Sequence, residues 1–210
     1  MSDQQYPPQR HLECDLQRLF GVVERYPLAT LISAEGDEAF VTHAPLTLDR
    51  TRGAHGVLFG HMDRSNPHSR LLNARAIRAI FHGANAYISP HVYGTSQLPT
   101  WNYLIVHASG VAHRLEDNQR VVQGLQGLSE KADRRKTAFR LSAEDPRIPP
   151  LINLVVGFEI TISTIIGRFK LSQDRSPADR RRAMDELIRN AKSCDESFLR
   201  SLLDSQKDST

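Results

Sequence analysis

Cysteines and long apolar runs are scarce in this 210-residue chain. Its two cysteines, Cys14 and Cys194, lie far apart and form no C-x-x-C motif, which argues against a disulfide framework and a thiolate zinc site. No stretch approaches the ~18 uninterrupted apolar residues of a membrane-spanning helix, and the first 15 residues hold no apolar segment of a signal peptide. We therefore expect a soluble, cytoplasmic protein with no membrane partner.

The excess of positive charge is also small. Lys and Arg number 27 and Asp and Glu 24, which gives a formal net charge of +3. This surplus is too small to indicate nucleic-acid binding by bulk electrostatics, so only a local basic patch could serve that purpose. Apolar residues make up 40% of the chain, which at this length is typical of one folded domain.

The motifs of several enzyme classes are missing. The chain has no G-x-G-x-x-G, no Walker loop, no G-x-S-x-G and no H-E-x-x-H. Nine histidines invite a metal site, but His107 and His113 on one strand would lie roughly 20 Å apart at about 3.3 Å per residue. We therefore assign no catalytic residue and no metal ligand.

The hydrophobic pattern predicts a mainly β fold of the α+β class in a single domain, residues 1–210. Short strands joined by tight turns favour an antiparallel sheet or a small barrel over a doubly wound fold. The predicted strands are a hairpin over 28–33 and 38–48, then 56–62, 74–83 and 101–115, and a hairpin or one long bent strand over 152–172. Helices are expected at about 10–25, 117–136 and 177–203, packed on the barrel, with loops at 84–100 and 137–150.

Polar and aromatic side chains gather near the ends of the predicted strands. Arg64, Lys170 and Arg175, with Ser172 and a helix N-terminus, are the groups that a phosphate dianion needs. Trp101 and Tyr103 point the same way on a strand and could face a flat ring system. The alternative is that the cations are ordinary surface residues and the aromatic rings anchor the core.

Strings of residues at fixed separations resemble one known family. They are His43-Ala44-Pro45-Leu46, Gly60-His61 with Arg64 and Asn66-Pro67, Tyr87-Ile88-Ser89-Pro90, Pro99-Thr100-Trp101-Asn102-Tyr103, Gly157-Phe158-Glu159-Ile160 and Lys170-Leu171-Ser172-Gln173. From about residue 10 to residue 190 the chain resembles the PaiB family of FMN-binding negative transcriptional regulators. The resemblance implies an FMN-binding split β-barrel with flanking helices, and a homodimer with FMN bound near the subunit interface.

The resemblance also implies which residues contact the cofactor. The phosphate is expected near the residues that leave one barrel strand, and the ring or the interface near the aromatic string. The FMN-binding set implied in this way is Thr42, His43, Pro45, His61, Met62, Arg64, Asn66, Trp101, Asn102, Tyr103, Lys170, Ser172 and Gln173.

Three functions follow from this interpretation. The first is an FMN-binding negative transcriptional regulator that is not an enzyme, with direct DNA contact through residues 177–203 left open. The second is an FMN-dependent oxidoreductase or flavin reductase on the same fold, because FMN itself carries redox chemistry. The third is a haem-binding or cofactor-free scaffold, since nine histidines could supply an axial ligand.

Overall fold

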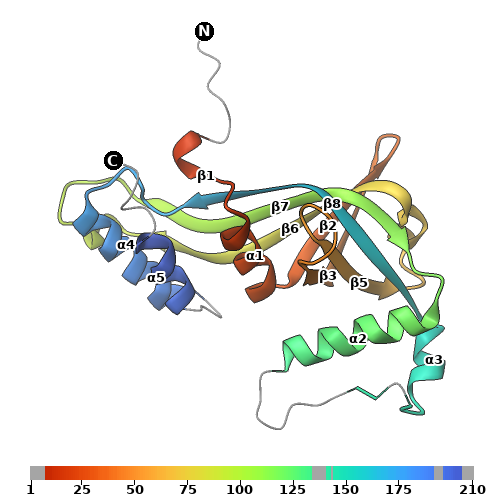
Figure 1. The fold of residues 1–210 in the computed structure, drawn as a ribbon. Helices are drawn as coiled ribbons and strands as arrows, with labels where there is room; N and C mark the ends of the chain where they lie inside the picture. The colour runs from red at the N-terminus through yellow and green to blue at the C-terminus, as the bar shows by residue number, and fades with distance from the viewer. Residues whose placement is uncertain (1–7, 134–140, 143, 192–195, 205–210) are drawn as a thin grey trace. The chain divides into compact units, whose positions relative to one another are not determined.

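The computed structural model describes residues 8–133, 141–142, 144–191 and 196–204 (Figure 1). Within them, eight strands form one sheet in the order β3-β2-β6-β7-β8-β5-β4, and β1 pairs with β8. Neighbouring strands such as β2 and β3, and β5 and β8, run antiparallel. This confirms the mainly β, α+β class.

Four consecutive strands follow the first α-helix, and most of the other helices lie in the second half of the chain. The strands are β1 (Leu12–Glu13), β2 (Leu28–Glu35), β3 (Glu38–Pro45), β4 (Thr47–Asp49), β5 (Val57–Asp63), β6 (Asn73–Ile88), β7 (Thr100–Arg114) and β8 (Val155–Lys170). The α-helices are α1 (Leu16–Arg25), α2 (Asn118–Ala132), α3 (Ile148–Ile152), α4 (Pro177–Asn190) and α5 (Glu196–Asp204). Single 3-10 turns are η1 (Gln9–His11), η2 (Pro67–Leu71) and η3 (Pro90–Val92).

The chain divides into two compact units, each described below by itself. Unit 1 comprises the described residues of 1–25, 82–106 and 166–210, and unit 2 those of 26–81 and 107–165. The three long strands β6, β7 and β8 each contribute residues to both units. The single domain expected from the sequence stays a prediction.

Unit 2 begins with the hairpin of β2 and β3. Glu35 pairs with Glu38 across a tight turn in which Gly36 has φ +60°, a left-handed conformation that glycine adopts without strain. Along β2 the residues alternate, so that Leu31 is fully buried while Leu28 is exposed. Close packing explains the glycine at position 60 on β5, because a Cβ there would lie 2.4 Å from Leu46 and 2.7 Å from the Phe158 ring.

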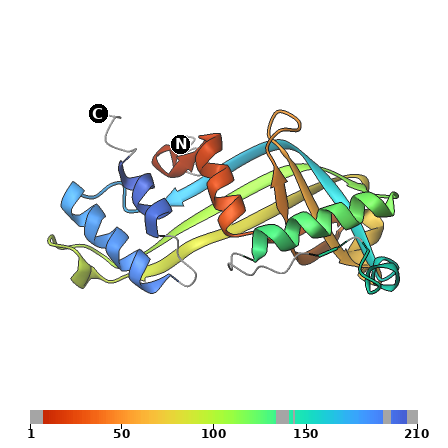
Figure 2. The ribbon, with the colours of Figure 1, turned by 60° about the horizontal axis from the view of Figure 1, so that its bottom comes forward.

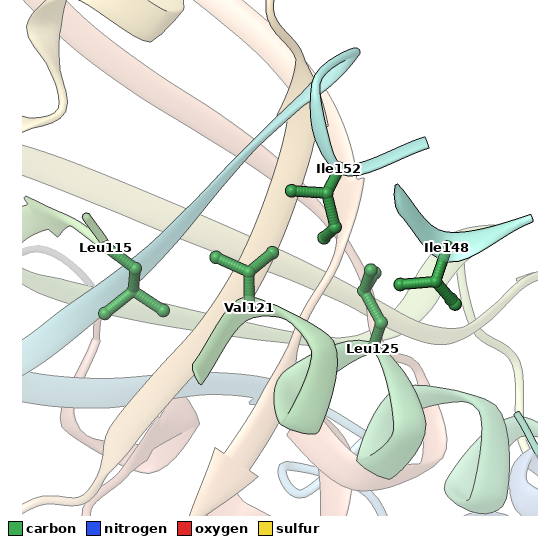
Figure 3. Close-up of a cluster of buried hydrophobic side chains, with 5 residues drawn as sticks. All are labelled: Leu115, Val121, Leu125, Ile148 and Ile152. Carbon is green, nitrogen blue, oxygen red and sulfur yellow. The ribbon is translucent and has the colours of Figure 1, made fainter. Parts of the chain in front are cut away.

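Helix α2 of unit 2 packs on a cluster of buried apolar side chains. Figure 3 shows its buried members, with side chains from α2 and α3 pointing toward one another; they are Leu115, Val121, Leu125, Ile148 and Ile152. The loop predicted over 137–150 was therefore wrong at its end, where α3 begins at Ile148. Pro149 is tolerated there because the first turn of a helix leaves backbone N–H groups without an intrahelical acceptor.

Helices dominate unit 1. One face of α1 is buried through Leu19, Phe20, Val22 and Val23, and α4 and α5 lie side by side in both views (Figure 2). The ring of Phe198 packs onto Gly21, where an added Cβ would lie 2.7 Å from it.

Several sequence boundaries need correction. The first helix starts at Leu16 and not near residue 10, because Leu12 and Glu13 pair with Arg168 and Gly167 as a strand. β6 continues to Ile88, five residues past the predicted end at residue 83, so only part of 84–100 is a loop. Residues 155–170 form one strand, which decides between the two alternatives for 152–172. The helical segment expected over 177–203 is a pair of helices, as its pattern predicts, and residues 192–195 between them are outside the described residues.

Two glycines of α2 offer a matched test of this packing. A Cβ on Gly124 would lie 2.1 Å from ring atoms of Phe59, whereas nothing lies within 4 Å of one on Gly127. We expect Gly124→Ala to lower the free energy of unfolding by about 1–3 kcal/mol through overpacking. We expect Gly127→Ala to raise it by about 0.5–1 kcal/mol, because alanine loses less backbone entropy in a helix. Urea denaturation of both variants measures the difference, and equal effects would contradict the described packing of α2.

Candidate functional site

The thirteen residues proposed for the cofactor fall into two sets. Unit 2 holds Thr42, His43, Pro45, His61, Met62, Arg64 and Asn66, and unit 1 holds Trp101, Asn102, Tyr103, Lys170, Ser172 and Gln173. Successive side chains on a strand point to opposite faces of the sheet, so strand residues that are neighbours in sequence within one set face opposite sides.

In unit 2 the structure brings Thr42 and Asn66 together. Asn66 caps the 3-10 turn η2, where its Oδ1 accepts from the backbone N–H of His68 at 2.9 Å. Its Nδ2 donates to Thr42 Oγ1 at 3.0 Å, and Nδ1 of His68 lies 3.0 Å from the same hydroxyl. His68 was not singled out in the sequence; its place directly after Asn66-Pro67, a helix-start signal, was the available clue.

The neighbouring histidines point elsewhere. His43 adjoins Thr42 on β3 but is exposed, with Nδ1 3.2 Å from Thr30 Oγ1. On β5, Met62 is buried toward the sheet interior, while His61 lies on the other face and its buried Nδ1 has no hydrogen-bond partner among the described residues. Burial lowers the pKa of His61. An unpartnered buried nitrogen leaves a hydrogen-bonding position open to a ligand.

Arg64 has an unusual set of partners. Its Nε donates to Asn153 O at 2.7 Å and its Nη2 donates to Val155 O at 2.8 Å, while its backbone N–H donates to Leu154 O at 2.8 Å. All these acceptors are neutral, and no described carboxylate lies within 4.0 Å of the guanidinium. The positive charge is held in place without being neutralised.

In unit 1 the amide of Asn102 and the hydroxyl of Ser172 form a buried network. Asn102 Nδ2 donates to Ser172 Oγ at 3.0 Å, and Tyr93 Oη lies 3.1 Å from the same oxygen. Ser172 has φ +59°, an uncommon conformation for a residue other than glycine. The network links the start of β7 to the residues that follow β8. Asn102 and Ser172, both predicted to contact the cofactor, therefore form hydrogen bonds within the protein.

Lys170, the cation of its string, is half-buried at the end of β8. Its Nζ donates to Thr100 Oγ1 at 2.6 Å, and no described carboxylate pairs with it. The side chain of Gln173 hydrogen-bonds to the backbone just before it: its Oε1 accepts from Leu171 N at 2.8 Å, and its Nε2 donates to Phe169 O. Arg175, also considered for the phosphate, lies 3.7 Å from the carboxylate of Asp174.

Aromatic rings occupy the open face of unit 1. Trp101 is 51% exposed and meets the edge of Tyr87, which is 49% exposed, at 6.2 Å between ring centroids. The indole Nε1 donates to Asn85 Oδ1 at 3.3 Å. Tyr103 lies on the same face, with the Arg168 guanidinium 5.6 Å from its ring centre. Such rings can pack against a flat ligand.

Chemically, a cation in either unit can hold an anion, and the exposed rings of unit 1 can pack against a planar ligand. Among the described residues, no group of three His, Cys, Asp or Glu side chains lies close enough to hold a metal ion. No described helix has the length and the apolar character needed to cross a membrane.

Comparisons with known proteins agree with this chemistry. Residues 5–164 match the model of a family described as "Putative FMN-binding domain". The Protease synthase and sporulation protein PAI 2 of Bacillus subtilis is 28% identical over 87% of this chain and 88% of its own.

Two solved structures share the fold. The flavocytochrome Anf3 of Azotobacter vinelandii has a TM-score of 0.59 at 13% identity, over 80% of this chain and 74% of its own. The FAD and heme binding protein of Mycobacterium smegmatis also has a TM-score of 0.59, at 12% identity, over 80% of this chain and 78% of its own.

Two buried imidazoles and one half-buried imidazole make stability depend on pH. Burial is the main cause that lowers the pKa of His11, His61 and His68 from 6.5. The unfolded chain therefore binds more protons than the folded one below about pH 6.5, so stability is fully present above that pH and falls as the pH falls. We expect urea denaturation to give a lower free energy of unfolding at pH 5.5 than at pH 7.5, with a smaller loss in His61→Gln. An identical loss in wild type and variant would contradict this account of His61.

Proposed function

The chain belongs to the FMN-binding domain family, and on that premise we propose that it is an FMN-binding negative transcriptional regulator of the PaiB type. The observation that carries the cofactor assignment is a held cation in unit 2, Arg64, whose guanidinium donates to neutral backbone oxygens and has no carboxylate partner among the described residues. The regulatory role is supported by the likeness to the PAI 2 protein of Bacillus subtilis. A regulator acts on DNA, so we place the protein in the cytoplasm.

The residues present fit FMN. Its phosphate needs a donor that carries positive charge, and in unit 2 the charge of Arg64 is fixed in place by neutral backbone oxygens. In the same unit, Nδ1 of His61 has no hydrogen-bond partner among the described residues and offers a further polar contact. When bound, FMN supplies the redox chemistry, and the chain's own task is to bind and orient it.

The thirteen proposed contacts differ in what the structure leaves available to a ligand. In unit 2, Arg64 and His61 keep polar atoms that described residues do not use. In unit 1, Asn102, Ser172 and Gln173 use their polar atoms in hydrogen bonds within the protein. We propose that Arg64 and His61 contact the cofactor; Lys170 and Trp101 belong to unit 1 and are not assigned to this site.

We also propose a homodimer, supported by the open face of the sheet in unit 2. Register pairs place Thr30 beside Ile80 and Ile32 beside Val41 on this face. Leu28 is 62% exposed and Val41 58% exposed. Apolar side chains gathered on one sheet face are typical of a surface that another protein covers, and a second copy is the partner that the family implies.

A direct DNA contact through α4 has little support. Arg182 pairs with Asp179 at 3.1 Å, Arg189 pairs with Glu186, and Arg200 pairs with Asp185 at 3.0 Å. Carboxylates thus neutralise much of the charge that phosphates of DNA would need. We propose that any regulation works through a surface other than this helix pair.

Substitution of each candidate cation tests where the phosphate binds. We expect Arg64→Ala to weaken FMN binding by about 1.5–3 kcal/mol, or roughly 10- to 150-fold, for the loss of one charge-assisted contact. Lys170→Ala tests the other end of β8, and an effect of that variant alone would place the phosphate there. Arg189→Gln, which removes a surface arginine from α4, is the control and should bind FMN as the wild type does. Fluorescence titration of FMN measures all three. Unchanged affinity in both alanine variants would move the phosphate elsewhere.

A charge on the open face tests the dimer. We expect Val41→Asp to convert the dimer to a monomer in light scattering after gel filtration, because a carboxylate would be desolvated at the interface. The residue is 58% exposed within one chain, so the fold of the monomer should persist. A wild-type protein that elutes as a monomer at every concentration would contradict the proposed assembly.

A further inference from the structure

A second cluster of charged side chains in unit 2 shares no residue with the FMN set. It lines a cleft of about 290 Å³ where α2 packs against β4 and β5. The lining residues that matter here are Arg52, Arg120, Lys131, Glu159 and Phe59. Three of these five are cations contributed by two separate segments of the chain.

One carboxylate holds two of the cations in position. Arg52 donates from Nη1 and Nη2 to the two oxygens of Glu159, both at 2.8 Å. Arg120 donates from Nη2 to Glu159 Oε1 at 3.0 Å. The Glu159 side chain is only 17% exposed, while those of Arg52 and Arg120 are 47% and 49% exposed. A buried carboxylate therefore orients two guanidinium groups that remain open to solvent.

The balance of charge in the cleft is positive. Lys131, at the end of α2, donates from Nζ to Leu48 O at 2.9 Å. Against the three cations stand two acids, Glu159 and Asp49, which leaves 3 − 2 = +1. Asp49 already accepts from the backbone N–H and the hydroxyl of Thr51, at 2.9 and 2.7 Å. Both carboxylates have donors, whereas each cation keeps N–H groups that donate to no described residue.

The floor of the cleft is apolar. Leu48 and Val57 are each 4% exposed, and the half-buried ring of Phe59 lies beside them. The ring can sit against α2 because Gly124 has no side chain there. An apolar floor below a cationic rim suits a ligand with an apolar body and one acidic group.

We propose that this cleft binds a small organic carboxylate with an apolar body, independently of FMN. The guanidinium groups present donors that match a carboxylate, and a single negative charge balances the local surplus of +1. An inorganic phosphate would leave the apolar floor in water. The volume of about 290 Å³ is at the lower limit of ligand pockets, so the ligand is small.

Calorimetric titration with benzoate, in the presence of excess FMN, tests this site. We expect saturable binding with a dissociation constant of about 1 mM or tighter in the wild-type protein. Arg120→Gln and Lys131→Gln should each weaken it about tenfold, because each removes one charge-assisted contact. The control Arg189→Gln removes an arginine that is likewise paired with a glutamate on a helix, and should bind benzoate normally.

Three results would overturn the proposal. They are the absence of saturable benzoate binding, equal binding of the neutral isostere benzamide, and displacement of benzoate by an equal concentration of inorganic phosphate. Circular dichroism melting and FMN titration of the two glutamine variants report their folding and their FMN site. Because neither residue belongs to the FMN set, the variants should bind FMN as the wild type does. Weaker FMN binding in a folded variant would contradict the independence of the two sites.

Discussion

The alternation of side chains along three long strands determines what the molecule can present to a ligand. On β7 the residues from Asn102 to Ala112 at even positions are buried, and those at odd positions, beginning with Trp101, face outward. Gly110 shows how tightly the inner face is packed, because a Cβ there would lie 2.1 Å from the carbonyl oxygen of Thr161. A shift of one residue would bury the indole and expose the core. The aromatic surface of unit 1 thus depends on this register.

Some basic residues of this chain lie beside carboxylates, and others are held by neutral oxygen atoms. Arg182, Arg189 and Arg200 lie close to carboxylates on α4 and α5, whereas Arg64 and Lys170 are held by neutral oxygens among the described residues. A neutral partner fixes the direction of the side chain without cancelling its charge. This property suits a phosphate ligand, and it is the physical reason for proposing a phosphate contact at Arg64.

The sequence predicted much of the fold, because strand alternation and helix caps are local signals. Ser176 followed by Pro177 marked the start of α4, and its hydroxyl does accept from Asp179 N at 3.2 Å. The end of β6 was missed because Gly83 suggested a stop, although the strand continues with small buried residues at 84 and 86. The short strand β1 exists only through pairing with β8, a distant contact that no local pattern contains. The partners of Arg64 and Asn102 are equally distant in sequence, so their roles could not be predicted.

The central claim is that this chain binds FMN through the phosphate. Titration of the purified wild-type protein with FMN and with riboflavin, followed by flavin fluorescence, tests it most directly. The account predicts saturation at about one FMN per chain and at least tenfold weaker binding of riboflavin, which lacks the phosphate that Arg64 would contact. No FMN binding, or equal affinity for the two flavins, would contradict it.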